Sequence, residues 1–490
     1  MSNLLPDNGL PGPPGRAGFW PIAVLAGLAL RLALLPLGPG FGYFPDHDDF
    51  TRWGIQAADR GLASLYVSPP PRADARTFDP KTREWRITRR DYDRVCNYPP
   101  LTAMLFAASG RAFQALSTDR LINTPLAWYL VQCWSVLADL VAAAGGAALA
   151  AALRPGSQRA AFLLLLFAPP FVWDSAVWGQ TDALLLAHAL WMVRAMTRRR
   201  WKLAGALLGI AAGFKPQAVL LVPLWALALL CRRERRQVAV GLAVAPLVLF
   251  VVSLPFTLHS GDAWFRRSYV ENLFEAHRAQ TTLVAFNLWY LDLLRTGSDN
   301  AHAPLFGLSR NAWGALLLAA ALAAGLVWSF RRRTNDADRL VAWAGLSLLA
   351  CVMLPTRVHE RYLLLPLAFL LVAAFNRRRL RAGAMLMLLV ASAQVTWPLW
   401  MKADAGLWHE IREQLEQQYA VRLQALPPDQ RLLVPPFEDL LKPHRARFER
   451  ERAQTIPFEW GCTIVALLGT ALTVRGLVRP RESRAGPASR

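Results

Sequence analysis

The sequence has few charged residues for its length. Asp, Glu, Lys and Arg make up 18% of the 490 residues, whereas soluble globular chains contain about 25%. Residues of the AVILMFWYC set make up 54%, and many fall in runs long enough to cross ~30 Å of hydrocarbon, which takes about 20 residues. These proportions exclude an ordinary soluble enzyme and an intrinsically disordered chain.

Cysteine is also scarce, and the common nucleotide-binding motifs are absent. The five cysteines have no metal-ligand spacing, which argues against a disulfide framework and against a zinc site. The sequence contains no G-x-x-x-x-G-K-[ST], no G-x-G-x-x-G after a strand and no H-E-x-x-H. It therefore predicts neither a nucleotide-binding domain nor a metalloprotease site.

The positive charge is concentrated in short segments between apolar runs. The formal net charge is +21, which could indicate nucleic-acid binding. However, six short segments hold 24 basic and four acidic residues, and Lys and Arg in short loops mark the cytoplasmic side of a membrane protein. We therefore predict no nucleic-acid partner, and both termini inside. The six segments are 154–159, 194–202, 232–236, 331–339, 377–381 and 475–490.

Hydropathy predicts an all-α polytopic membrane protein with about twelve transmembrane helices. The N-terminal apolar segment lacks a small-residue cleavage site, so we expect a retained helix and not a signal peptide. The predicted spans are 19–39, 125–153, 160–175, 181–197, 203–215, 216–231, 237–257, 309–330, 339–355, 361–376, 381–400 and 458–478. The predicted regions are a cytoplasmic tail (1–18), a transmembrane module (19–400), an outer helical and Pro-rich segment (401–457), a last span (458–478) and a second tail (479–490).

Long segments of the chain then lie on the outer side of the membrane. They are 40–124, about 258–308, and 401–457, which begins as an amphipathic helix. The apolar stretch that starts at Tyr98-Pro99-Pro100 would invert every later loop if it crossed the membrane. We therefore predict an interfacial or re-entrant helix there.

The first chemical motif, residues 44–53 (FPDHDDFTRW), follows the first span. Three carboxylates and a histidine are costly beside a membrane unless they have partners. Asp46, Asp48 and Asp49 could supply a general base or bind a divalent cation. A solvated loop with an acidic helix N-cap is the structural alternative.

Two further motifs lie at predicted outer ends of spans. Residues 173–182 (WDSAVWGQTD) place Trp178, Gln180 and Asp182 between two spans; a polar turn with an N-cap is the alternative. Lys215 precedes Pro216, which interrupts the helix. Lys215 could extend its ammonium to the headgroups or point into a cavity as a phosphate partner.

A fourth motif, residues 357–362 (RVHERY), places four ionisable groups at an outer boundary where few Arg are expected. Arg recognises phosphate oxygens bidentately and with permanent charge, so we interpret Arg357, His359 and Arg361 as a phosphate clamp. An Arg–Glu network joining two helices is the structural alternative. Arg31 and Asp139, within spans, could pair with each other.

Together these motifs resemble the GT-C glycosyltransferases, and most closely the dolichyl-phosphate-glucose-dependent glucosyltransferases of asparagine-linked glycan assembly. The likeness covers about residues 20–400. Residues 173–182 also resemble bacterial proteins related to the GPI mannosyltransferases. The matching segments are the acidic motif 44–53, Tyr98-Pro99-Pro100-Leu101-Thr102-Ala103, the lone Asp139, Phe214-Lys215-Pro216-Gln217, Asn287-Leu288-Trp289 and Val358-His359-Glu360-Arg361.

The resemblance implies a GT-C-like bundle that transfers a hexose of the glucose or mannose class from a polyprenyl-phosphate sugar to a lipid-linked or envelope glycan, with inversion. The catalytic base would be Asp46, with Asp48 and Asp49 as alternatives, and no cofactor would be required. A bacterial inner membrane, with the site on the extracytoplasmic side, is the expected location. The implied phosphate ligands are Lys215, Arg357, His359 and Arg361, and the implied substrate contacts are Tyr98, Trp178, Gln180, Asp182, Gln217 and Glu360.

Two other classes fit the same spans. Intramembrane charges and a Pro-broken helix suit a secondary transporter or lipid flippase. A surface-polysaccharide polymerase or ligase shares the plan of many spans and large outer loops. Substrate flux would identify the first class, and product length the second.

Overall fold

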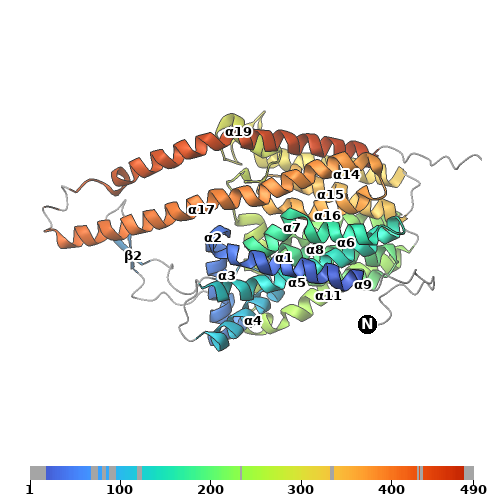
Figure 1. Cartoon of the computed structure of the whole chain (residues 1–490), viewed down its shortest axis with the longest axis horizontal. Coiled ribbons are helices and arrows are strands. Elements are labelled where there is room, and N and C mark those ends of the chain that lie inside the picture. The colour runs from blue at the N-terminus through green and yellow to red at the C-terminus, as the bar shows by residue number, and fades with distance from the viewer. Residues whose placement is uncertain are drawn as a thin grey trace, which may run out of the picture.

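The computed structural model is an elongated helical bundle from which two long helices project (Figure 1). Its helices run mostly along one axis, as expected where backbone groups must be satisfied within each segment of a membrane span. The described residues are 18–67, 76–79, 84–87, 95–117, 124–231, 234–331, 336–427, 430 and 434–478.

The N-terminal part forms the first span and then helices α3 and α4, which lie at one end of the bundle (Figure 1). A helix does begin at Pro100, as predicted, because proline fits the first turn of a helix. The elements are α1 Phe19–Leu34, η2 Leu35–Leu37, α2 Gly38–Phe41, α3 Phe44–Arg60, η3 Leu62–Leu65, β1 Arg76–Asp79, β2 Glu84–Ile87 and α4 Pro100–Leu116.

The middle of the chain forms the central helices of the bundle. The predicted spans 125–153 and 181–197 correspond to α5 and α8. The elements are α5 Pro125–Leu153, α6 Gln158–Phe167, α7 Pro169–Trp173, η4 Asp174–Trp178, α8 Asp182–Thr197, α9 Trp201–Phe214, η5 Pro216–Leu221, α10 Val222–Cys231, α11 Arg235–Ser260, α12 Ala263–Phe265 and η6 Arg266–Glu275.

The last part adds short paired strands and the remaining long helices. Strand β3 pairs in parallel with β6, and β4 pairs antiparallel with β5. The elements are β3 Thr282–Leu283, α13 Leu288–Thr296, β4 Pro304–Leu305, β5 Leu308–Ser309, α14 Arg310–Arg331, α15 Asp336–Met353, β6 Val358–His359, η7 Glu360–Leu363, α16 Leu364–Ala374, η8 Arg378–Leu380, α17 Arg381–Ala425 and α19 Phe437–Val478.

The prediction of about twelve transmembrane helices is not confirmed. Among the described residues, six helices are long and apolar enough to cross a membrane, or seven if one pair bent by 47° counts as a span. Several other predicted spans are helices, but shorter than the 18 residues required, such as Trp201–Phe214 and Pro216–Leu230. The chain is therefore an integral membrane protein in which short apolar helices pack among the long ones.

The segment 401–457, which was predicted to begin as an amphipathic helix, belongs largely to two long helices that continue into the bundle. Helix α17 continues without interruption from the span to Ala425, and α19 runs from Phe437 into the last span despite Pro443 and Pro457. Figure 1 shows these two helices extending side by side past the bundle. Near their connection, Tyr419, Leu423 and Phe437 pack in a small apolar cluster.

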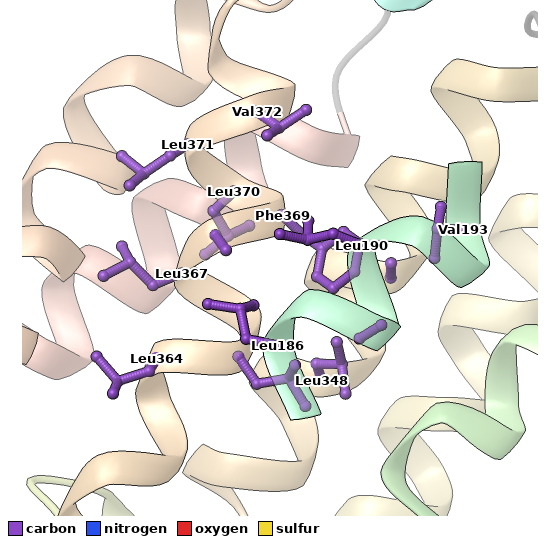
Figure 2. Close-up of a cluster of buried hydrophobic side chains, with 14 of the residues drawn as sticks. Leu186, Leu190, Val193, Leu348, Leu364, Leu367, Phe369, Leu370, Leu371 and Val372 are labelled. Atoms are coloured by element: carbon purple, nitrogen blue, oxygen red, sulfur yellow. The ribbon is translucent and has the colours of Figure 1, made fainter. Parts of the chain in front are cut away.

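The packing of α8 against α16 forms the apolar centre of the bundle (Figure 2). Leu190 and Phe369 are completely buried, and close van der Waals packing of this kind stabilises helix association within a membrane. Because α8 begins at Asp182 and α16 follows Arg361, this packing brings the first residues of the two helices to the same end of the bundle.

Helices α3 and α4 cross with almost no space between their backbones. A Cβ on Gly110 would lie 2.1 Å from the carbonyl oxygen of Gly54. Beside this crossing, Phe50 stacks on Phe106 with ring centroids 4.6 Å apart. The close contact fixes the position of the acidic first turn of α3.

The predicted pairing of Arg31 with Asp139 is confirmed. The Arg31 Nε donates a hydrogen bond to Asp139 Oδ2 at 2.8 Å, and Ser175 Oγ donates to the same oxygen at 2.5 Å. Both charged side chains are buried. This pair joins α1, α5 and η4.

Replacing Arg31 with methionine will therefore lower the free energy of unfolding by about 3–5 kcal/mol, because it leaves the Asp139 carboxylate buried without its counter-ion. Thermal unfolding in detergent measures the loss. The double variant Arg31→Met/Asp139→Asn removes both charges and will recover most of the lost stability. Equal losses in the single and double variants would show that the pair contributes through packing alone.

Candidate active site

Lys215, Asp182 and Arg361 meet at the end of the bundle where α8 begins. The Lys215 ammonium donates to Asp182 Oδ2 at 2.7 Å, and Arg361 Nε lies 3.2 Å from the same oxygen. The Lys215 side chain is 3% exposed, so its cationic group lies inside the protein and does not extend to the headgroups. Three sequence motifs far apart in the chain thus contribute to one ionic cluster.

The break in the helix at Pro216 produces the position of Lys215. Proline disfavours the α conformation in the residue before it, and Lys215 is extended, with φ −145° and ψ 137°. The Phe214 carbonyl, near the end of α9, accepts a hydrogen bond from Thr102 Oγ1 at 2.6 Å. A side chain of α4 thereby satisfies a helix-end carbonyl that would otherwise be buried without a partner.

Asp46 lies in the first turn of α3 and is linked to the same region through Gln180. Gln180 Nε2 donates to Asp46 Oδ2 at 2.6 Å, and the Tyr98 hydroxyl lies 3.4 Å from Gln180 Oε1. Burial raises the pKa of Tyr98 well above its ordinary value, so its hydroxyl keeps its proton. The structure thus brings Asp46, Gln180 and Tyr98 together.

A π-helical turn, η4, carries Asp174 and Trp178 into the site. Such turns are uncommon and are frequent at functional sites. The turn ends at Gly179, which has φ 73°; a Cβ there would lie 2.5 Å from His47 Nε2. Trp178 lies against Arg361, whose Cζ is 5.3 Å from the ring centroid, a distance that suits a cation–π contact.

His47 ties α3 to this π-helical turn. Its Nε2 donates to the Trp178 carbonyl at 2.9 Å, and its ring stacks on Trp128 with centroids 3.5 Å apart. Burial lowers the pKa of His47 to about 3, although the hydrogen bond to Trp178 acts in the opposite direction. The neutral imidazole therefore acts as a fixed connection beside Asp46.

Stability should consequently fall in acid. The unfolded chain binds a proton at His47 below about pH 6.5, but the folded chain does so only near pH 3. Each pH unit between these values lowers the free energy of unfolding by about 1.4 kcal/mol. Thermal unfolding between pH 7 and pH 5 tests this. The His47→Asn variant will lack the change in unfolding free energy with pH that His47 causes. Replacing the exposed His277 with asparagine will leave that pH dependence in place.

The three acidic residues of motif 44–53 have different surroundings. Asp48 Oδ2 accepts a hydrogen bond from Arg52 Nε at 2.8 Å, one turn further along the helix. Asp49 is half-buried and lies one turn after Asp46. Within the described ranges, no group of three His, Cys, Asp or Glu side chains is arranged to hold a metal ion.

Residues 357–361 form a strained platform beside the cluster. Arg357 has φ 62°, and Val284, which bridges to His359, also has φ 62°. A positive φ is strongly disfavoured for a β-branched residue, and strain of this kind collects at functional sites. The Arg357 guanidinium donates a hydrogen bond to the Phe274 carbonyl at 3.1 Å. His359 Nδ1 lies 3.7 Å from Glu360 Oε2, and Glu360 Oε1 accepts from Arg361 at 3.3 Å.

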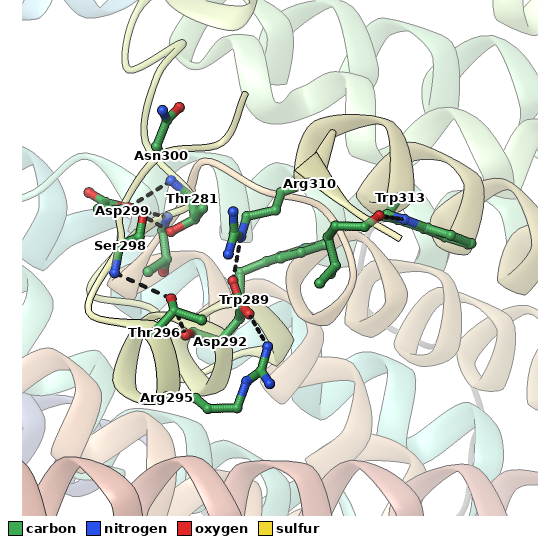
Figure 3. A network of polar contacts seen from close by, with 12 residues as sticks. Thr281, Trp289, Asp292, Arg295, Thr296, Ser298, Asp299, Asn300, Arg310 and Trp313 are labelled. Atoms are coloured by element: carbon green, nitrogen blue, oxygen red, sulfur yellow. Dashed lines mark hydrogen bonds and ion pairs between the residues drawn. The ribbon is translucent and has the colours of Figure 1, made fainter. Parts of the chain in front are cut away.

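A polar network holds the loop that pairs with this platform (Figure 3). Asp299 Oδ1 accepts from Thr281 N at 2.7 Å and from Thr281 Oγ1 at 2.6 Å. Asp292, on α13, pairs with Arg310 at the start of α14. Asn287 caps α13 through Trp289 N at 3.0 Å. The matching segment 287–289 therefore has a structural part in supporting the site.

A cavity of about 20 Å³ lies within the cluster. Its lining includes Asp174 and Gln217, and Gln217 Nε2 donates to the Tyr362 hydroxyl at 2.5 Å. Space of this size holds about one water molecule.

Asp174 and Tyr362 were not among the predicted site residues. Their positions within motifs 173–182 and 357–362 were the available signal.

The site thus combines one carboxylate accessible from α3 with two buried cations. A carboxylate can accept a proton from a hydroxyl, and cations can stabilise negative charge as it develops on a leaving group. Those two abilities together are the requirements of group transfer from a phosphate-linked donor.

Comparison with known proteins agrees with this arrangement. No curated protein sequence matches the chain. The model of glycosyltransferase family 87 matches residues 97–355, which include Tyr98, Asp182 and Lys215 but neither Asp46 nor Arg361. This match is consistent with a polytopic GT-C-type glycosyltransferase, and it identifies a membrane glycosyltransferase. Because it covers more than half of the 490 residues, the chain belongs to glycosyltransferase family 87.

Proposed function

We propose that the protein transfers a hexose of the glucose or mannose class from a polyprenyl-phosphate sugar to a lipid-linked or envelope glycan, with inversion at the anomeric carbon. The observation that carries the proposal is the convergence of Asp46 with the Lys215–Asp182–Arg361 cluster through the turn 178–182. The location proposed is a bacterial inner membrane, with both termini inside and the site outside. The arginine-rich segments 194–202 and 377–381 lie at the opposite ends of the helices from the site, in agreement with the charge rule.

In the proposed reaction, Asp46 accepts the proton of the acceptor hydroxyl as its oxygen attacks the anomeric carbon. The new C–O bond forms on the face opposite the phosphate, and the bond from the anomeric carbon to the phosphate oxygen breaks. That oxygen departs with the electron pair as polyprenyl phosphate. Lys215 and Arg361 stabilise its charge; His359 and Arg357 are secondary candidates. No metal or other cofactor is needed for this balance.

The other residues at the site have positioning functions. Gln180 orients Asp46, and Tyr98 holds Gln180 from the other side. Trp178, Gln217 and Glu360 surround Arg361 and Tyr362. The hydroxyls of Tyr98 and Tyr362 and the amides of Gln180 and Gln217 are proposed to contact the sugar as well.

The test uses the purified protein in nanodiscs with a panel of radiolabelled polyprenyl-phosphate sugars and a lipid extract of the host as the acceptor pool. Label that moves from one donor into a new species supports the proposal and identifies the sugar. Transfer from nucleotide sugars alone would overturn the proposed donor. Substrate flux into proteoliposomes without any transfer would support a transporter, and a product longer by many sugars would support a polymerase.

A further inference from the structure

One carboxylate oxygen serves both cations of the site. Asp182 Oδ2 is 2.7 Å from Lys215 Nζ and 3.2 Å from Arg361 Nε. Asp182 is the first residue of α8, where the helix dipole favours a negative group. A phosphate oxygen bound by the same two cations would occupy much the same place.

The cations retain donors for a further anion. A lysine ammonium carries three N–H donors and a guanidinium carries five. Within the part of the chain that the structure describes, the Lys215 ammonium donates a hydrogen bond to Asp182, and the Arg361 guanidinium donates one to Glu360. Neither side chain is exposed enough for water to satisfy the rest freely.

Carboxylates already oppose both cations of the cluster before any donor arrives. Asp182 and Glu360 pair with Lys215 and Arg361, and Asp174 also interacts with both cations. An arriving phosphodiester adds one more negative charge to this group. The carboxylate that shares both cations is therefore the one that competes with it most directly.

We infer that Asp182 is a resident counter-ion which holds Lys215 and Arg361 together in the empty site and competes with the donor and product phosphates for them. The inference rests on the proposed function, because it takes the anion to be the phosphate of a polyprenyl donor. Asp182 is thereby a positioning residue and not a substrate contact.

The competition has a consequence for product release. Transfer converts a phosphodiester into a phosphate monoester, whose negative charge at neutral pH is greater. The carboxylate of Asp182 beside the phosphate opposes that increase. Asp182 therefore weakens the binding of the product and speeds its departure.

The experiment compares the wild type, Asp182→Asn and Asp338→Asn in nanodiscs. Asp338 is a matched control, because it also forms a buried pair with an arginine, Arg377, at 2.5 Å. Calorimetric titration with farnesyl phosphate measures affinity, and farnesol is the uncharged control ligand. We expect Asp182→Asn to bind farnesyl phosphate at least tenfold more tightly, with farnesol unchanged and Asp338→Asn like the wild type. Steady-state turnover of Asp182→Asn should fall, because the more tightly bound product leaves more slowly.

Weaker or unchanged binding of farnesyl phosphate to Asp182→Asn overturns the inference, because a purely structural partner can only help the cations to bind. If that variant does not fold, Lys215→Met is compared with Lys215→Met/Asp182→Asn, in which both members of the ion pair are neutral. The double variant must bind more tightly. If the wild-type protein transfers sugar but the variants do not show this gain in affinity for farnesyl phosphate, only the inference about Asp182 is rejected. Wild-type protein that neither binds farnesyl phosphate nor transfers from a polyprenyl donor rejects the proposed function as well.

Discussion

Replacing Asp46 with asparagine is expected to lower the rate of sugar transfer by ~10³-fold while the protein remains folded, since a general base contributes about 10²–10⁴-fold. Asparagine has nearly the same shape but cannot take the proton of the acceptor hydroxyl. Its side-chain oxygen can still accept the hydrogen bond that Gln180 Nε2 now gives to the carboxylate. Single-turnover transfer from a radiolabelled donor in nanodiscs measures the change.

A matched change on the same helix separates catalysis from folding. Asp59, near the end of α3, accepts a hydrogen bond from Gln114 on the surface, and Asp59→Asn should retain transfer within about twofold, as expected for a surface substitution. Binding of farnesyl phosphate should be the same in both variants. If Asp46→Asn kept its activity while Asp49→Asn lost it, the base would be Asp49, one turn further along the same face.

The sequence predicted the elements of the site better than their connections. The motifs around Asp46, Asp182, Lys215 and Arg361 were each found from charge placed beside apolar segments. Charge in such places is expensive unless it has a partner, so it indicates that partners exist. Arg31 and Asp139 show the same principle, and their pairing was predicted because both lie within spans.

The pairing within the site was not predictable, because it depends on how helices far apart in the chain pack. The sequence did not predict that Asp182 contacts two cations. It also did not predict the positive φ of Arg357 or the hydrogen bond from its guanidinium to the Phe274 carbonyl. Local propensity does not predict a strained backbone, because tertiary contacts impose it.

Hydropathy also did not predict where the long helices end. The prediction ended one element near residue 400, where hydropathy falls, but α17 continues to Ala425. A helix can leave the membrane without ending, because its backbone hydrogen bonds are internal whether lipid or water surrounds it. In contrast, the π-helical turn at Asp174–Trp178 has no signature in composition, although it places Trp178 against Arg361.

The second large effect is expected at Lys215. Lys215→Met should lower the turnover number by about 10²–10³-fold, the loss typical when one preorganised donor to a developing negative charge is removed. The KM for the donor should change much less, because the charge on the leaving phosphate grows as the bond breaks and interactions specific to the transition state appear in kcat. Steady-state transfer at varied donor concentration separates the two parameters.

The Lys215→Met protein should remain folded, because Asp182 keeps Arg361 as its partner. Lys202 provides the control, since it is exposed at the other end of α9 and its replacement by methionine removes the same charge far from the site. Lys202→Met should transfer sugar at the wild-type rate. A fall in kcat of less than threefold in Lys215→Met would contradict the assignment and leave Arg361 to stabilise the leaving phosphate alone. A rise in KM with unchanged kcat would instead show that Lys215 binds the donor equally in its ground and transition states.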